Sequence, residues 1–158
     1  MFEGSVVGIY IAAASGVPMQ AHDEVEAVAG AGLVGDRYAT AAGTYSGRRL
    51  DDAHRAVTLI ESEAIRAARA EGRLELDAAE TRRNLVTAGV PLNHLVDQEF
   101  EVGGVRLRGV DLSEPCAYLE RETRPGVRAA LIHRGGLRAE ILAGGWIRVG
   151  DRVRAGGA

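Results

Sequence analysis

The one cysteine of the chain, Cys116, stands where a thiol could act as a nucleophile or a metal ligand. It follows Glu114-Pro115, after a strand predicted from Val105 to Asp111. Proline favours the first turn of a helix, where unpaired backbone N–H groups and the positive end of the helix dipole favour a thiolate. The negative charge of Glu114 acts against this. The alternative interpretation is a small buried apolar residue, which lone cysteines often are.

Three other segments carry groups that bind anions. Arg82-Arg83-Asn84 lies between a predicted short helix and a strand, where it could clamp a phosphate or simply be solvated. The segment 133–138, His-Arg-Gly-Gly-Leu-Arg, surrounds a glycine pair that would let a ligand approach the backbone, or would only end a helix. The segment 30–35 matches GxGxxG, but no helical apolar stripe follows it, which favours a glycine-rich loop carrying Asp36-Arg37.

The composition excludes several classes of site. One cysteine rules out an intrachain disulfide and a four-cysteine zinc or iron–sulfur site. The four histidines, at positions 22, 54, 94 and 133, have no metal-ligand spacing. No flavin, haem or iron–sulfur motif is present, so electrons for any redox reaction must come from outside the chain. All 19 basic residues are arginine, yet the net charge of −3 gives no support for a nucleic-acid partner.

The chain has 158 residues, which indicates a single domain over 1–158. No apolar run is long enough for a membrane span. The first residues contain the acidic Glu3 and no basic region, so they predict a first strand and not a signal peptide. We therefore expect a cytoplasmic protein without a membrane partner.

Short apolar alternations and glycine turns predict many strands. They are expected at Val6–Ala12, Glu24–Ala29, Ala56–Ile60, Asn84–Thr87, Phe100–Val102, Val105–Val110, Leu137–Leu142, Trp146–Val149 and Arg152–Arg154, with a hairpin at Gly103-Gly104 and a long loop over 30–50. Helices are expected at Glu61–Glu71 before a stop at Gly72, after Asp77 with a capping box to Glu80, and at Val127–His133. This pattern predicts an α+β, mostly β fold that resembles a barrel.

Taken together, the segments resemble the MOSC domain, the C-terminal module of molybdenum-cofactor sulfurases, which also occurs as a small stand-alone bacterial-type protein. The matching segments are Gly32-Leu33-Val34-Gly35-Asp36-Arg37, Val57-Thr58-Leu59-Ile60-Glu61, Arg82-Arg83-Asn84-Leu85-Val86-Thr87, Leu112-Ser113-Glu114-Pro115-Cys116, His133-Arg134-Gly135-Gly136-Leu137-Arg138 and Ile147-Arg148-Val149-Gly150-Asp151. They occur in order over most of the chain.

The resemblance implies a β-barrel with short peripheral helices and a molybdenum cofactor (molybdopterin). In one functional picture, Cys116 is the thiolate ligand of molybdenum in an oxidoreductase that reduces N-hydroxylated small molecules with electrons from an external reductase. In a second, Cys116 carries sulfur as a persulfide received from a cysteine desulfurase. The resemblance places Arg37, Arg83, Asn84, Arg134 and Arg138 near the pterin phosphate, with His133 as a proton donor to pterin or substrate. A third picture is a non-catalytic anion- or cofactor-binding module.

If Cys116 is functional, Cys116→Ser will abolish activity or persulfide loading and change the free energy of unfolding little, because the side-chain volume barely changes. Assays of both functions together with denaturant unfolding check this. Full activity of the serine variant would contradict it.

Overall fold

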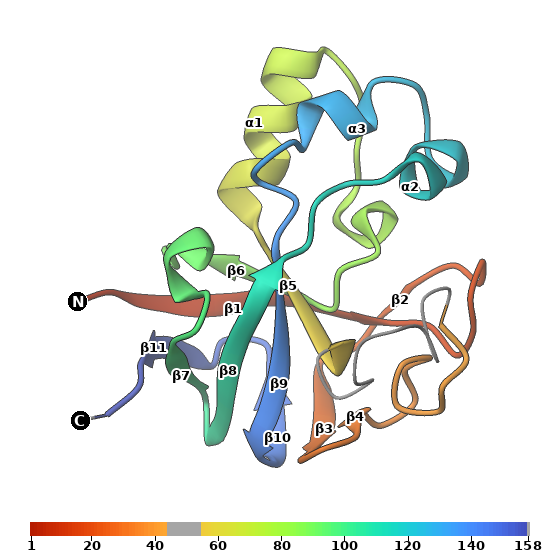
Figure 1. The fold of residues 1–158 in the computed structure, drawn as a ribbon. Helices are drawn as coiled ribbons and strands as arrows, with labels where there is room; N and C mark the ends of the chain where they lie inside the picture. Colours follow the sequence, from red (N-terminus) through yellow and green to blue (C-terminus); the bar gives the residue numbers. More distant parts are fainter. Residues whose placement is uncertain (44–54, 158) are drawn as a thin grey trace.

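Seven strands form a closed barrel in a computed structural model that describes residues 1–43 and 55–157 (Figure 1). In ring order they are β1 (Glu3–Ile11), β6 (Leu85–Ala88), β5 (Val57–Glu61), β9 (Leu137–Ala143), β8 (Val105–Leu112), β7 (Glu99–Val102) and β11 (Arg152–Ala155). Pairing of Glu3 with Arg154 closes the ring. β5 and β6 run parallel, whereas the other pairs within the ring are antiparallel. The mostly β, barrel-like fold predicted from the sequence is confirmed.

A smaller sheet stands beside the barrel and consists of β10 (Gly145–Arg148), β3 (Glu24–Val28) and β4 (Gly32–Leu33). A short strand, β2 (Gln20–Ala21), pairs antiparallel with the end of β1. The loop expected over 30–50 thus contains a strand where the GxGxxG pattern stands. Residues 44–50 of that loop, and His54, lie outside the described residues.

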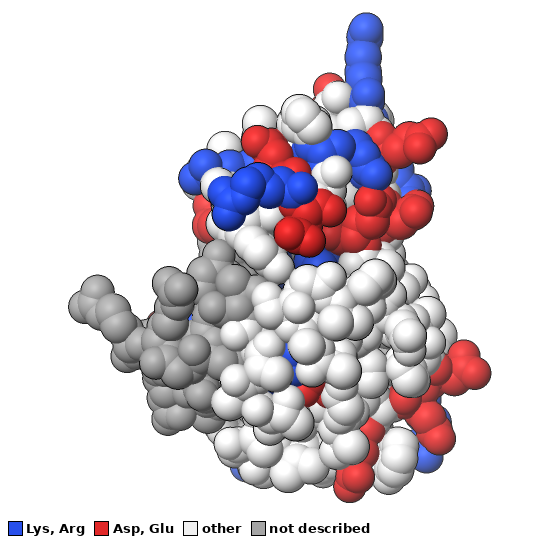
Figure 2. All heavy atoms as spheres, turned by 90° about the vertical axis from the view of Figure 1, so that its right-hand side faces the viewer, with Lys and Arg blue, Asp and Glu red and all other residues white. Residues whose placement is uncertain are grey.

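The helices gather at one end of the barrel (Figure 1). They are α1 (Ser62–Gly72), α2 (Ala117–Glu122) and α3 (Val127–Ala130), together with the 3₁₀ turn η2 (Ala78–Thr81). A second 3₁₀ turn, η3 (Leu92–Leu95), packs instead into the barrel core through Leu92 and Leu95. Charged side chains crowd this helical end, while the barrel face below it in Figure 2 is mostly uncharged. None of the described helices has the length and apolar character needed to cross a membrane.

Strand β5 is buried on both faces because it separates two apolar cores. Leu59 faces the barrel interior, where it joins Phe100 and Leu137. Ile60 points the other way and joins a second cluster formed with α1, α2 and α3. Successive side chains of a strand point to opposite faces, so the buried run at 57–60, which is apolar except for Thr58, serves both cores.

The predicted helix Val127–His133 is wrong at its end, since α3 stops at Ala130. The chain must turn there to enter β9 through a crowded passage. A Cβ atom on Gly136 would lie 2.0 Å from the carbonyl oxygen of Leu59, and Gly136 has a φ of +112°. Helical geometry cannot continue through this passage, and glycine is the residue that fits it.

We expect Gly136→Ala to destabilise the fold far more than Gly150→Ala. Gly150 also has a positive φ, of +96°, but a Cβ atom there meets nothing within 4 Å. Gly150→Ala should cost about 1–2 kcal/mol for the backbone conformation alone, and Gly136→Ala roughly 1–3 kcal/mol more because the backbone must also move. Denaturant unfolding measures both values. Equal losses would show that the close approach to Leu59 does not matter.

Candidate functional site

A cavity of about 250 Å³ is lined in part by Ser113, Glu114 and Cys116, which lie between the end of β8 and the start of α2. Its lining combines one thiol and one carboxylate with five guanidinium groups. The lining residues are Arg37, Tyr38, Arg55, Thr58, Arg82, Arg83, Ser113, Glu114, Cys116 and Arg138. They come from segments far apart in the sequence, which the barrel and the helical layer bring together. An arginine-rich lining favours an anionic ligand.

The cavity wall is built on the buried carboxylate of Asp36, whose exposed fraction is 0%. Its Oδ1 accepts hydrogen bonds from the backbone N–H of Ala12 at 3.2 Å, from Nη1 of Arg37 at 3.0 Å and from Nδ2 of Asn84 at 3.3 Å. Its Oδ2 accepts one from the backbone N–H of Tyr38 at 3.3 Å. These contacts compensate the charge that burial removes from water.

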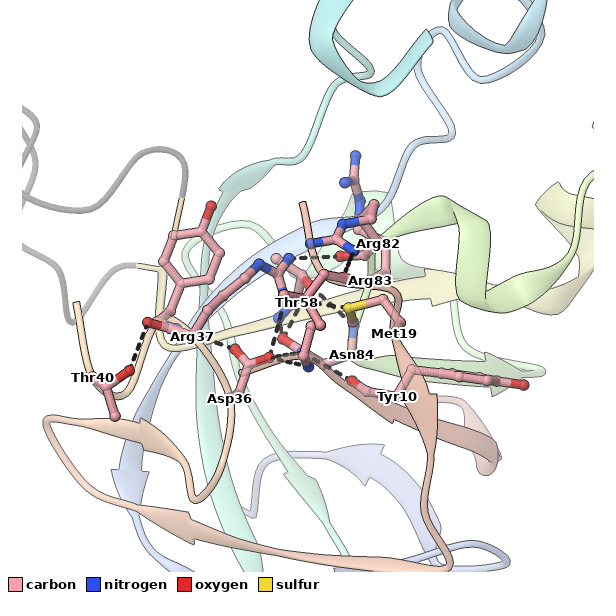
Figure 3. A network of polar contacts seen from close by, with 12 residues as sticks. Tyr10, Met19, Asp36, Arg37, Thr40, Thr58, Arg82, Arg83 and Asn84 are labelled. Atoms are coloured by element: carbon pink, nitrogen blue, oxygen red, sulfur yellow. Dashed lines mark hydrogen bonds and ion pairs between the residues drawn. The ribbon is translucent and has the colours of Figure 1, made fainter. Parts of the chain in front are cut away.

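Asn84 connects this carboxylate to the strands of the barrel (Figure 3). Its Oδ1 accepts from both the backbone N–H and the hydroxyl of Thr58, at 3.0 and 3.2 Å. Its Nδ2 donates to the carbonyl oxygen of Tyr10 at 3.1 Å as well as to Asp36. Its hydrogen-bonding groups are therefore engaged inside the protein, and Asn84 supports the wall of the cavity without lining it.

Arg37 is almost fully buried and fixed on several sides. Figure 3 shows its side chain between the Asp36 carboxylate and the sulfur of Met19, which lies 3.3 Å from Nη1. Its Nη2 donates to the carbonyl oxygen of Arg82 at 3.2 Å, and its guanidinium carbon stands 4.9 Å from the ring centre of Tyr38. The charge of this guanidinium is matched by Asp36 before any ligand arrives.

Arg83 differs from Arg37 because backbone carbonyls hold it. Its Nε donates to Gly135 at 2.7 Å, its Nη2 to Ser113 at 2.8 Å and its Nη1 to Thr81 at 3.2 Å. No carboxylate of the described residues lies within ion-pair distance of it. Burial lowers the pKa of the guanidinium to about 10, and the nearby Cys116 acts in the opposite direction. Arg83 is thus a fixed, protonated cation beside the thiol.

Cys116 is the N-cap residue of α2, with an extended backbone, and lines the cavity. The expectation that Pro115 starts the helix and that the thiol lies in its first turn is therefore off by one or two residues. Since α2 has only six residues, its dipole is a weak source of stabilisation for a thiolate. The guanidinium of Arg83 is a cation that interacts electrostatically with Cys116.

Arg138 is a cation of the lining that already has a carboxylate partner. It forms a bidentate pair with Asp111, at 2.7 and 2.9 Å.

Glu114 is the acidic residue of the lining. Oε1 of Glu114 accepts the backbone N–H of His133 at 2.8 Å, and its Oε2 lies 2.9 Å from the Nδ1 of His133. His133 itself does not line the cavity and reaches it only through Glu114.

The structure does not bring Arg134 to the cavity, contrary to the expected convergence of the arginine segments. Its Nη2 pairs with Glu71 of α1 at 2.8 Å, and its Nε donates to Ala130 at 2.7 Å. His133 has a φ of +62°, so the chain turns sharply here and directs Arg134 toward the helices. Of the predicted cofactor-binding residues, Arg37, Arg83 and Arg138 meet in the cavity, while their role in binding stays a prediction.

Sequence reasoning did not single out four lining residues: Tyr38, Arg55, Thr58 and Ser113. Thr58 and Ser113 stand inside the segments that carry the family resemblance, so those segments held a signal for them. Tyr38 adjoins the Asp36-Arg37 pair, and Arg55 precedes β5, but neither belongs to a pattern that predicts a site.

Comparison with known proteins gives a match to the model of the MOSC domain over residues 35–154. The structure is similar to that of YuaD from Bacillus subtilis, with a TM-score of 0.80 and 17% identity over 97% of each chain. It is similar to YiiM from Geobacillus stearothermophilus, with a TM-score of 0.71 and 14% identity over 98% of this chain and 75% of that one. For YiiM from Escherichia coli the TM-score is 0.66 and the identity 17%, over 100% and 71%. At these identities the likeness shows the fold. No significant match is found among curated proteins.

The pair Asp36–Arg37 generates a prediction about stability. Asp36→Ala should lower the free energy of unfolding by about 3–5 kcal/mol, because it leaves the Arg37 charge buried without a partner. Asp36→Ala combined with Arg37→Met should cost less than Asp36→Ala alone. The exposed pair Glu101–Arg154 is the control, and Glu101→Ala should cost at most about 1 kcal/mol. Additive losses in the double variant would contradict the coupling.

Proposed function

The chain belongs to the MOSC domain family, and from this premise we propose that its cavity binds a molybdenum cofactor with Cys116 as the protein ligand of the metal. We further propose that the protein is an oxidoreductase that removes the hydroxyl oxygen of N-hydroxylated compounds. Its electrons would come from an external reductase, because the sequence carries no other redox motif.

The donor set of the cavity fits such a cofactor. A cysteine sulfur is the soft ligand that suits this metal, and the arginines suit the pterin phosphate. No cluster of three ligating side chains occurs among residues 1–43 and 55–157. A metal bound at Cys116 would therefore take most of its ligands from the cofactor itself, which is what a dithiolene provides.

The observation that carries the proposal is the way Arg83 is held. Three backbone carbonyls fix its guanidinium, and no carboxylate of the described residues lies within ion-pair distance of it. Burial also lowers its pKa to about 10, so its positive charge costs the fold stability at neutral pH, and this cost falls as the pH rises above about 10. An anion bound beside Arg83 would offset this cost.

Each group then has a defined task. Arg83 and Arg82 would bind the phosphate, while Arg37 and Arg138, whose charges are matched by Asp36 and Asp111, would shape the wall of the cavity beside them. Cys116 would hold the metal, and the bound cofactor would supply two-electron redox chemistry. The walls of the cavity, fixed through Asp36 and Asn84, would orient the substrate.

Sulfur carriage is the second candidate, and the same Arg83–Cys116 proximity favours it. A persulfide on Cys116 is an anionic sulfur when deprotonated, and the adjacent guanidinium would stabilise it as it would a thiolate. This candidate requires a cysteine desulfurase as partner and no metal. Metal content therefore distinguishes the two functions.

The decisive experiment produces the protein in a host that makes molybdenum cofactor and measures molybdenum and pterin in the purified chain. We expect stoichiometric molybdenum, and reduction of an amidoxime to an amidine when reduced viologen supplies electrons. If the protein acquires no molybdenum but accepts persulfide sulfur from a cysteine desulfurase, its function is sulfur carriage and not reduction.

Arg83→Gln should lower cofactor occupancy roughly tenfold or more, because it removes charge-assisted hydrogen bonds worth about 1.5–3 kcal/mol. Arg106→Gln makes the same change of charge on the exposed side of β8 and should leave occupancy unchanged. Arg83→Lys keeps the charge but loses the planar fork, and should lie between them. Thermal unfolding of each variant separates lost binding from lost folding. If the folded Arg83→Gln protein retains full cofactor occupancy, Arg83 does not contribute to cofactor binding.

A further inference from the structure

Glu114 is a carboxylate in a cavity where four of the five lining arginines bond to other groups. Arg37 bonds to Asp36, Arg138 to Asp111, and Arg83 and Arg82 to backbone carbonyls. The described partner of Glu114 is His133, and none of these four arginines forms an ion pair with it. These four arginines thus leave the Glu114 carboxylate, which lines the cavity with Cys116, without a direct ion pair to them.

His133 fixes the Glu114 carboxylate from outside the cavity. The backbone N–H of His133 binds Oε1 and its ring nitrogen binds Oε2, at 2.8 and 2.9 Å. The carbonyl oxygen of His133 is held in turn by Nδ2 of Asn93 at 2.7 Å. His133 adopts a φ of +62°, which non-glycine residues seldom do, and these contacts hold it there. A carboxylate held by two hydrogen bonds still has lone pairs for a ligand, and this side chain is 44% exposed.

We propose that Glu114 recognises the N–H groups of an amidine-like substrate, with His133 as its positioning residue; this rests on the proposed reductase function. A carboxylate accepts two N–H groups from an amidinium, or an N–H and the O–H of an N-hydroxyamidine, in a planar, bidentate geometry. The arginines offer no acceptor for these donors, which leaves Glu114 as their site. The cavity is therefore bipolar: its arginines bind the anionic part of the cofactor, and Glu114 selects nitrogen-rich bases over anionic N-hydroxylated compounds.

The test measures binding of benzamidine, the neutral isostere benzamide and inorganic phosphate to the full chain by calorimetry. Wild-type protein should prefer benzamidine to benzamide. Glu114→Gln should weaken benzamidine binding roughly ten- to hundredfold and leave benzamide binding unchanged. Phosphate binding should become tighter, because the variant removes a negative charge from the cavity. Glu101→Gln is the matched control, because it removes a carboxylate far from the cavity lining. Glu114→Asp keeps the charge and serves if Glu114→Gln does not fold; it should give an intermediate loss.

His133→Asn tests the positioning role, since asparagine tolerates a positive φ and keeps the backbone N–H. It should reduce the ratio of benzamidine to benzamide affinity, whereas a purely structural role would weaken both equally. A wild-type protein that does not prefer benzamidine, or a folded Glu114→Gln that retains the preference, overturns the inference. Molybdenum content and amidoxime reduction are measured on the same samples. Lost benzamidine preference with normal molybdenum loading refutes only the role of Glu114, and a retained preference without molybdenum refutes only the reductase.

Discussion

The buried carboxylate of Asp36 is the interaction on which the rest of the site depends. It joins the end of β1, the segment after β4 and the start of β6 through hydrogen bonds to Ala12, Arg37 and Asn84. A charge inside a protein is tolerated only when its partners are complete, so each of these segments has essentially one position relative to the others. The cavity inherits this rigidity because Arg37 is part of its wall and the residue before Asn84 is Arg83.

The hydrogen-bond partners of each arginine show whether that arginine supports the fold or is available to bind a ligand. Arg134 and Arg138 bind carboxylates, and their charges are matched within the chain. Arg83 binds carbonyl oxygens, which orient a guanidinium but carry only partial charge. The cavity therefore retains positive potential where the thiol stands. A chain whose basic residues are all arginine can use one residue type for both purposes, since the planar fork donates to carbonyl oxygens as well as to carboxylates.

The sequence predicted the barrel, the hairpin at Gly103-Gly104 and the capping box of Asp77, because local patterns determine these features. It also selected Arg37, Arg83 and Cys116, which do share a cavity. It could not show that the side-chain oxygen of Asn84 would be engaged by hydrogen bonds from Thr58, because that contact depends on the pairing of β5 with β6. Nor could it show that the backbone turn at His133 would direct neighbouring side chains to different sides. Side-chain direction at an irregular turn depends on tertiary packing, which the helical or strand periodicity of a sequence does not reveal.

The closure of the barrel between β1 and β11 has a consequence for how the chain is made. Among the described strands of the ring, β1 leaves the ribosome well before its neighbour β11, which is separated from it by the other strands. Until β11 arrives, β1 and β7 each present an unpaired edge of backbone N–H and C=O groups, which is the kind of edge that joins strands of other chains. Ring closure is a contact between distant parts of the sequence and is correspondingly slow. We expect the nascent chain to be most prone to aggregation while β1 and β7 are exposed and β11 has not yet joined them.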